Sequence, residues 1–578
     1  MSQVGTYETP RKSKDSSKLS LFDRMTSTAY KIFGTQGKKI AASSPEMRDQ
    51  ILKSNLRITP EGLVSLALFS TVLSLVAVAV CVILGLVLHI VFLYLVALAP
   101  PIVFVLIWNL PKASQSSRAE GIENELPMLI GFLGVLSGGG VSPVSTLRRI
   151  SGMSKVFPAS AKEAKRILVD IEVFGVDPIT AFENAATHMP NKSFAEFLYG
   201  YTTVLKVGGD VKGYVNNKLK ETLDGRSSKV RRITDSVGTL AEAYLTVTAV
   251  MGITLFSLYQ LEGVVSHNSS GLQSLYIFSY LVVPAISALF IFIIDGTQPK
   301  QPYFNKRPYF VFIACIPIGV ILFLTPLPLQ LSLHAGLALA SINIIPSVVA
   351  FRQSRERDGL EKALPDFIRD VAEGRKIGLS PEGSIEQLAS KNYGRLSKSI
   401  KTMGSQISWG LPIIKVIKTF ADSVDSWITM AIGTLMVEVV DVGGGTVGSF
   451  SQMADFTRKV NELESDKRSA LKSYIFVVYM AGIMLVLTTF MMVYFLSTPI
   501  KFAGAAGAAA AAAPGLTIDP ATVQLLLTAS IFDGWVIGLV AGKMGGGSVA
   551  DGFKHSLALV IVGALMVASS GLILGHPI

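Results

Sequence analysis

Two stretches of the sequence open in the same way: residues 123–130 read ENELPMLI, and residues 361–368 read EKALPDFI. Sixteen residues after the proline of each stretch comes a second proline, in GVSP at 140–143 and in GLSP at 378–381. The register is therefore the same over both stretches, with an offset of 238 residues.

Both openings lie in long polar blocks, residues 111–236 and 351–472, with mainly apolar sequence between them. Near the far end of each block, a Gly-Gly pair at 208–209 or at 444–445 precedes a polar stretch and then an apolar run. Because spacing, order and flanks agree, we predict a duplicated domain rather than a short-period solenoid.

Each block is predicted to be helical. The apolar residues of the second opening follow the stripe of an amphipathic helix, at Leu364, Phe367, Ile368, Val371 and Ala372. Three pairs are typical of helix starts, where a side-chain oxygen caps a free amide and Pro takes the first helical position: Ser142-Pro143, Asp177-Pro178 and Ser380-Pro381. We therefore expect each block to be a bundle of about six helices.

The composition indicates a membrane protein. Half of the 578 residues are hydrophobic and only 16% are charged, whereas soluble domains carry about 25% charged residues. This excludes a soluble enzyme and a disordered chain. A spanning helix needs ~20 apolar residues, and the sequence offers two such segments in 62–109, divided near Gly85, and further ones at 239–261, 273–294, 308–326, 331–350, 473–496, 521–541 and 556–574.

The distribution of positive charge predicts a cytoplasmic N-terminus and an external C-terminus. In that orientation the external segments hold one cation, Lys501, of the 52 Lys and Arg residues, as the positive-inside rule requires. Both polar blocks are then cytoplasmic, because an even number of spans separates them. About 60 mostly polar residues precede the first span, which argues against a signal peptide.

The predicted fold is an all-α integral membrane protein with about nine transmembrane helices and two duplicated cytoplasmic helical bundles. In chain order we expect a basic cytoplasmic N-terminal arm (1–61), a transmembrane hairpin (62–109) and a first cytoplasmic domain (111–236). Four transmembrane helices (239–350), a second cytoplasmic domain (351–472) and three transmembrane helices with an Ala-rich external loop (473–578) follow. The arm is expected to be flexible and to lie against anionic membrane lipid.

No pattern for catalysis, a cofactor or a metal is found. The two Cys and six His have no partners at ligand spacing. Residues 443–448 match G-x-G-x-x-G by letter, but the helical pattern around them favours a helix–helix turn over a dinucleotide site. Residues 538–544 resemble a P-loop that is one residue short and ends in Met544 instead of a hydroxyl. We expect neither an enzyme nor a nucleic-acid-binding protein.

One predicted span has residues suited to helix packing. Gly534, Gly538 and Gly542 recur every four residues on one face, where small residues let another backbone approach. Asp533 lies mid-way through this span, and an acid in a membrane is a candidate for proton transfer. Because no basic partner is evident, we interpret Asp533 as a neutral or hydrogen-bonded residue that holds helices together.

Two basic pairs flank the Ser-Pro turns of the two blocks. These pairs are Arg148-Arg149 and Arg375-Lys376. A solvated surface explains them without any further function. A docking patch for an acidic partner is the sharper hypothesis.

The E-x-x-L-P opening, the following Ser-Pro and the Gly-Gly turn before a span together resemble the type II secretion system F domain. That family defines the inner-membrane platforms of type II secretion systems and type IV pili. Nine spans with two separated domains are similar to its archaeal branch, and the run from Gly538 to Ser556 resembles the archaellum (archaeal flagellum) assembly platforms. The resemblance extends from about residue 55 to the end.

The resemblance implies a function in filament assembly at the cell membrane of an archaeon. A cytoplasmic hexameric ATPase would dock on the two domains, and the platform would lift pilin-like subunits from the bilayer. Other archaellum motor proteins would join it for rotation and motility, and a homodimer is left open. An adhesion pilus or secretion platform is the nearest alternative. A secondary transporter is more distant, because transporters duplicate membrane bundles, whereas here the polar block is duplicated.

Overall fold

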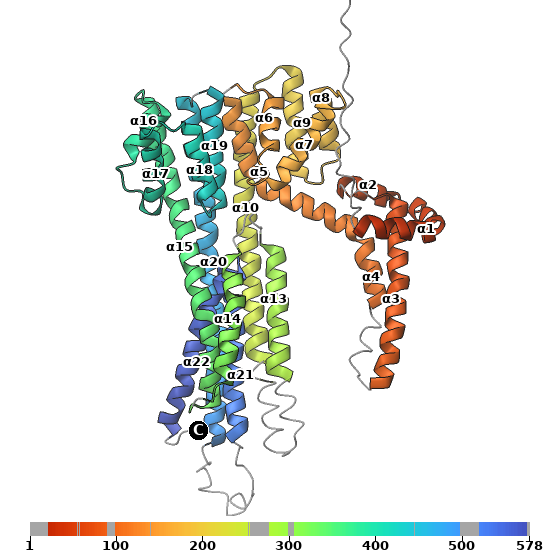
Figure 1. Ribbon diagram of the computed structural model, residues 1–578, viewed down its shortest axis with the longest axis vertical. Coiled ribbons are helices and arrows are strands. Elements are labelled where there is room, and N and C mark those ends of the chain that lie inside the picture. Colours follow the sequence, from red (N-terminus) through yellow and green to blue (C-terminus); the bar gives the residue numbers. More distant parts are fainter. Residues whose placement is uncertain are drawn as a thin grey trace, which may run out of the picture. The chain divides into compact units, whose positions relative to one another are not determined.

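The computed structural model describes residues 21–54, 56, 58–88, 99–138, 140–251, 254, 277–298, 306–326, 328–443, 445–497 and 520–574. Over these ranges the regular elements are all helices, with no strand (Figure 1). Seven of the helices are long and apolar enough to cross a membrane. The chain is thus an all-α membrane protein, as predicted.

The described helices form two compact units. The smaller unit comprises residues 1–125 and 159–209, and the larger unit comprises residues 126–158 and 210–578. The predicted first domain, 111–236, is therefore divided between the two units, whereas the predicted second domain, 351–472, lies within the larger one.

The smaller unit contains α1 (Leu21–Ala42), α2 (Pro45–Ser54), α3 (Pro60–Leu88), α4 (Ala99–Trp108), the first half of α5 (Leu110–Gly138), α7 (Pro158–Glu172), α8 (Pro178–Thr187) and α9 (Lys192–Val207). Its α1 and α2 pack against the start of α3 through Ala29, Met47, Ile51, Leu63 and Val64. The expectation of a flexible arm is therefore wrong for residues 21–54. The many polar residues there form one face of amphipathic helices. Residues 1–20 lie outside the described part.

The predicted turn near Gly85 is also wrong, because α3 continues through Gly85 to Leu88. Glycine costs a helix about 1 kcal/mol, but a backbone group left unpaired in hydrocarbon costs several kcal/mol. An isolated glycine in an apolar run is thus too weak a signal to end a helix there.

The larger unit contains the second half of α5, α6 (Pro143–Ser151), α10 (Val211–Thr246), α13 (Val283–Thr297), α14 (Arg307–Leu324), α15 (Leu331–Lys376), α16 (Pro381–Leu388), α17 (Ser397–Ser408), α18 (Ile413–Ser423), α19 (Trp427–Gly443), α20 (Val447–Ser497), α21 (Pro520–Gly546) and α22 (Gly552–Leu574). Short π-helical segments, η2 (Val247–Met251) and η3 (Phe278–Val282), and 3₁₀ turns, η4 (Gly394–Leu396) and η5 (Val549–Asp551), connect some of them.

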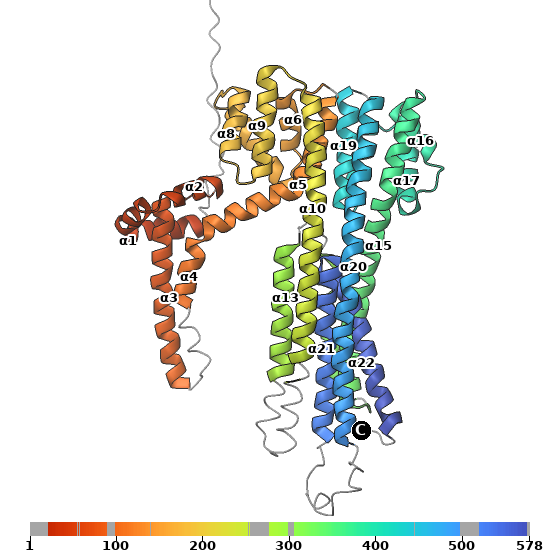
Figure 2. The same cartoon turned by 180° about the vertical axis from the view of Figure 1, so that it is seen from behind.

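Two helices of the larger unit are long enough to link a polar block to the membrane. α15 has 46 residues and α20 has 51, which at 1.5 Å per residue gives lengths of about 70 and 75 Å. A bilayer core is ~30 Å thick, so about half of each helix extends beyond it. Figures 1 and 2 show both helices running without a break from the block into the bundle that contains α21 and α22.

The spans agree with the described helices where both can be compared. Those helices coincide with the predicted spans at 308–326, 331–350, 473–496, 521–541 and 556–574. Of the span at 273–294 they include residues 278–294, and α3 covers the first part of 62–109. The remaining two predictions involve α4, an apolar helix of 10 residues, and 239–261, of which 252–253 and 255–261 lie outside the described residues. The count of nine therefore stays a prediction.

The predicted helix starts are confirmed. The Ser142 hydroxyl accepts a hydrogen bond from the Ser145 amide, and Ser380 does the same for the Gly383 amide. Asp177 caps α8. In each case Pro occupies the first turn, where its missing N–H has no intrahelical partner.

Candidate functional site

The two repeats meet along α10 and α20 in the larger unit. The Gln452 side chain donates a hydrogen bond to the side chain of Asn216, 236 residues earlier. Gly238 lies against the ring of Tyr474, since a Cβ added at Gly238 would be 2.6 Å from it. In both pairs the two residues are 236 positions apart in the sequence, which is also the separation between the two Gly-Gly turns. When equivalent positions contact each other, an approximate twofold axis runs between them.

The repeats are also joined by charged and polar contacts of α6 and the segment after it. Arg149 donates to Asp441 Oδ2 at 2.6 Å and also pairs with Glu438. Lys155 pairs with Asp422 at 2.7 Å. The indole of Trp427 donates to the carbonyl of residue 156 at 2.8 Å. The hydrogen bond to Asp441 raises the pKa of the Arg149 guanidinium, which stays charged.

The predicted docking residues therefore differ in their surroundings. Arg149 holds the first repeat to the second, and Arg375 donates to the carbonyl of Gly445 at 2.9 Å. Their neighbours Arg148 and Lys376 are exposed, although Lys376 lies 2.7 Å from Glu373. Arg149 and Arg375 both contact residues at the end of α19, because Asp441 and Gly445 are four residues apart. The docking role of the four residues stays a prediction.

An exposed aromatic side chain at one turn of each repeat was missed by the sequence reasoning. Phe174 is 71% exposed at the α7–α8 turn, and Trp409 is 81% exposed at the α17–α18 turn. Each directly precedes a glycine in the left-handed conformation, Gly175 with φ +68° and Gly410 with φ +83°. Their separation of 235 residues marks them as equivalent. The repeated aromatic–glycine pair, with a proline soon after, was the available signal.

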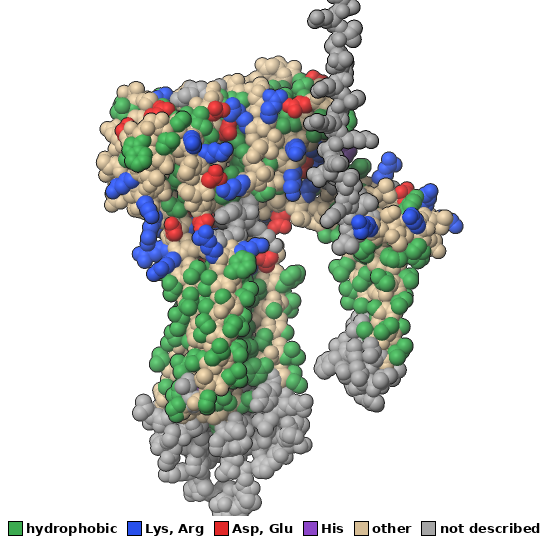
Figure 3. All heavy atoms as spheres, viewed as in Figure 1, with side chains coloured by type: hydrophobic (Ala, Val, Ile, Leu, Met, Phe, Trp, Pro, Cys, Tyr) green, Lys and Arg blue, Asp and Glu red, His purple; other side chains and the backbone are tan. Residues whose placement is uncertain are grey.

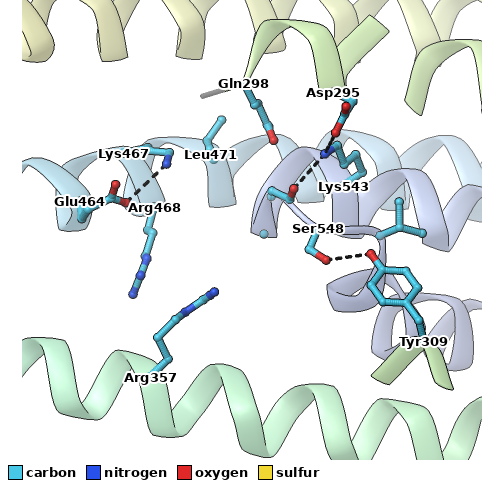
Figure 4. Close-up of a pocket in the computed structure, with 14 residues that line it drawn as sticks. Asp295, Gln298, Tyr309, Arg357, Glu464, Lys467, Arg468, Leu471, Lys543 and Ser548 are labelled. Atoms are coloured by element: carbon cyan, nitrogen blue, oxygen red, sulfur yellow. Dashed lines mark hydrogen bonds and ion pairs between the residues drawn. The ribbon is translucent and has the colours of Figure 1, made fainter. Parts of the chain in front are cut away.

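A polar cavity of about 320 Å³ lies within the larger unit where the long helices leave the block (Figure 4). We call it the polar joint. It is lined by Arg357 of α15, by Lys467 and Arg468 of α20, and by residues around the α21–α22 turn. Lys543 donates to Asp295 at 2.6 Å, and Tyr309 lies 3.1 Å from the Ser548 hydroxyl.

Arg468 ties the two long helices together beside this cavity. Its Nη2 is 2.6 Å from Glu361 Oε2, and its Nη1 pairs with Asp358. Glu361 is only 3% exposed and also accepts a hydrogen bond from Ser426 at 2.8 Å. A motion of α15 relative to α20 must therefore break a buried, charge-assisted contact.

The glycine face of α21 packs against α22. A Cβ added at Gly542 would lie 2.0 Å from the backbone of Gly552, and one at Gly538 would lie 2.3 Å from the backbone of Ser556. Gly534 has more room, with its nearest neighbour at 3.9 Å. The adjacent Asp533 is buried, and its Oδ1 has no hydrogen-bond partner in the structure. Gly538 and Gly542 therefore allow a close contact inside the chain, and the helix-packing role of Asp533 and Gly534 stays a prediction.

Among the described residues, no group of three His, Cys, Asp or Glu side chains could hold a metal ion. The G-x-G-x-x-G match lies between two helices, α19 and α20, with Gly445 at φ +68°. A dinucleotide fingerprint follows a strand, so these residues form the helix–helix turn that the sequence favoured.

Comparison with known proteins identifies the duplicated element. The family model for the type II secretion system (T2SS) protein F matches twice, at residues 129–258 and 367–494. Each of the two repeats is thus similar to the type II secretion system F domain. Each match begins in the helix that carries the Leu-Pro motif and continues past the Gly-Gly turn into the following apolar run.

An uncharacterized protein of Methanocaldococcus jannaschii, MJ1286, is 24% identical over 499 residues, which cover 79% of this chain and 81% of that protein. No solved structure matches the chain. The two F-domain matches and the apolar helices together support a multi-pass membrane platform of a secretion or pilus system.

Proposed function

We propose that this protein is the membrane platform on which a type IV pilus-like filament, most specifically an archaellum, is assembled. A cytoplasmic hexameric ATPase docks on the F domains, and its motion is passed to the spans, which lift pilin-like subunits from the bilayer. The platform itself is not an enzyme, and rotation of the filament would use the same coupling.

The continuity of the long helices carries this proposal. α15 and α20 each belong both to the block and to the apolar bundle. A helix transmits displacement along its length because its backbone hydrogen bonds are satisfied within it. Force applied to the block therefore reaches the spans through α15 and α20, at whose crossing the Arg468–Glu361 contact lies.

Docking is assigned to the two aromatic turns. Large exposed aromatic side chains are typical anchors of protein interfaces, and here one occurs at the same place in each repeat. In the larger unit this turn lies far from the spans. α19 runs along α15 away from the apolar bundle, from Glu361 at its start to Arg375 at its end. The preceding α18 is antiparallel to α19, so the α17–α18 turn lies at the end of the block remote from the spans. A partner with repeated binding surfaces, such as a ring ATPase, could engage both turns.

The test is a pull-down of the full-length protein from detergent, with mass spectrometry of the bound proteins. We expect a hexameric secretion-type ATPase with the wild type, less with F174A or W409A, and none with the double variant. F292A removes an aromatic that is 77% exposed on α13 and serves as the matched control. An equal yield from the double variant contradicts the docking assignment, and absence of any ATPase from the wild type contradicts the platform proposal.

The same experiment separates the alternatives. Recovery of archaellum motor proteins selects the archaellum, and recovery of other pilin-like subunits selects an adhesion pilus or a secretion system. Solute uptake by reconstituted protein, without an ATPase partner, would instead support a transporter.

A further inference from the structure

A second cavity in the larger unit, of about 540 Å³, has no role in the proposed coupling. It is bounded by α15, by the start of α22 and by η4. We call it the basic groove. Its lining residues are Ser347, Val348, Phe351, Arg352, Arg355, Glu356, Arg395 and Lys554.

The groove lies where two spans end. On α15, residues 331–351 carry no Asp, Glu, Lys or Arg, and Arg352 and Arg355 follow directly. On the neighbouring α22, Lys554 precedes the apolar run from residue 556 onward. Figure 3 shows Lys and Arg side chains gathered where the hydrophobic surface of this bundle gives way to the block. That level corresponds to the headgroup region of a bilayer.

The charge of the groove is one-sided. Four cations line it against a single carboxylate, Glu356. Within the part of the chain that the structure describes, none of these four cations forms an ion pair within 4.0 Å. Arg395 is held over α15, because Gly359 leaves room there for its stem: a Cβ at Gly359 would be 2.4 Å from Arg395 Cγ. The groove is therefore suited to an anion.

The other wall of the groove is apolar and continues toward the bilayer core. Val348 and Phe351 are exposed on α15, as are Ile344 and Ile345 on the membrane side of the groove. Lys554 Nζ lies 6.0 Å from the centroid of the Phe351 ring, within reach of a cation–π contact. An anion that enters here would therefore have hydrocarbon-compatible surface directly beneath it.

One polar group in the groove lacks a partner. Ser347 is 4% exposed, and its Oγ has no hydrogen-bond partner in the structure. A buried hydroxyl left without a partner is destabilising. An ester or phosphate oxygen bound in the groove would accept a hydrogen bond from this hydroxyl.

From these observations we propose that the basic groove binds the phosphate headgroup of an acidic membrane phospholipid, with an acyl chain along the exposed face of α15. The cations select the phosphate, and the apolar wall selects a lipid over a soluble anion. The site anchors α15 and α22 at the level where the block meets the membrane. It does not depend on the proposed function, because it requires only that α15 and α22 cross a bilayer.

The test uses full-length protein in a neutral detergent, with thermal unfolding followed as lipid is added. We expect phosphatidylglycerol to raise the unfolding midpoint, and phosphatidylcholine and inorganic phosphate to leave it unchanged. R352Q/R355Q should weaken the affinity for phosphatidylglycerol, read from the lipid concentration needed for a given shift, roughly 30-fold, from about 1 kcal/mol for each basic residue near an anionic surface. R352K/R355K should retain most of it. Because both arginines are exposed, neither double variant should disturb folding.

The control is K415Q/K418Q, which removes the same charge from exposed positions on α18. It should leave the lipid effect intact. Equal shifts with phosphatidylglycerol and phosphatidylcholine, or an unchanged response of R352Q/R355Q, would overturn the site. An equal shift with inorganic phosphate would overturn the lipid and leave only a soluble-anion site.

Discussion

Replacing Arg468 by Met should destabilise the protein at the crossing of α15 and α20. The substitution keeps much of the side-chain volume and removes the charge that pairs with Glu361 at 2.6 Å and with Asp358. Glu361 is then left as a buried carboxylate whose remaining partner is the Ser426 hydroxyl at 2.8 Å. Asp358 also loses its contact with Arg468, but the cost is small because Asp358 is about one-third exposed and has Arg357 Nε at 3.8 Å.

Removing one partner of a buried ion pair costs about 3–5 kcal/mol. Because Arg468 is 24% exposed and Ser426 still donates to Glu361, we expect the lower end, about 3 kcal/mol. In R468M/E361L the Glu361 carboxylate is gone, and the nearby Glu464 keeps Lys467 at 3.4 Å. The main loss is then the acceptor for the Ser426 hydroxyl, about 1 kcal/mol. The double variant should therefore be about 2 kcal/mol more stable than R468M.

The measurement is detergent-solubilised protein titrated with SDS, with unfolding followed by tryptophan fluorescence, since Trp427 directly follows Ser426. R458M is the matched control on the same helix, because Arg458 is 67% exposed and its surface pairs are 3.5 Å or longer. Such pairs contribute about 0–1 kcal/mol. The reasoning is refuted if R468M unfolds with the wild type, or if R468M/E361L is less stable than R468M.

Three further predictions concern packing, inter-repeat contacts and pH. G542A should lower the thermal unfolding midpoint because its Cβ would meet the α22 backbone at 2.0 Å, whereas G225A, with nothing within 4 Å, should be neutral or stabilising; equal midpoints would contradict this. R149E should lower the midpoint by breaking the pairs with two carboxylates, while K418E, at an exposed position on α18, should not. Glu125 accepts hydrogen bonds from two amides at the start of α7, but burial outweighs these bonds and raises its pKa above 4.5. Its contribution to stability is therefore complete below the unfolded pKa and declines as pH rises through the folded pKa, so E125Q should remove that decline in a pH series of unfolding midpoints.

The sequence alone determined the class of the protein and its internal repeat. Apolar runs of about 20 residues can only be helices in a bilayer, because unpaired backbone groups are too costly there. The Ser-Pro pairs predicted helix starts correctly because capping is a local interaction between residues three apart. The repeat was visible because the two blocks keep the same spacing of Leu-Pro, Ser-Pro and Gly-Gly.

Signals that depended on the surroundings of a residue were weaker. Gly85 did not end α3, and residues 21–54 are helical despite their polar composition. Both errors have the same origin. A single residue type or an average composition says little when burial against another helix, or exclusion of water by lipid, decides the backbone conformation.

Only the tertiary structure decided what the charged and glycine residues contact. Arg149 and Arg375 resemble their exposed neighbours in sequence, yet they hold other parts of the chain. The pairing of Asn216 with Gln452 brings together positions 236 residues apart. Such contacts are non-local, and the cost of closing so long a loop is met only by the packing of whole helices. No local pattern could therefore have predicted them.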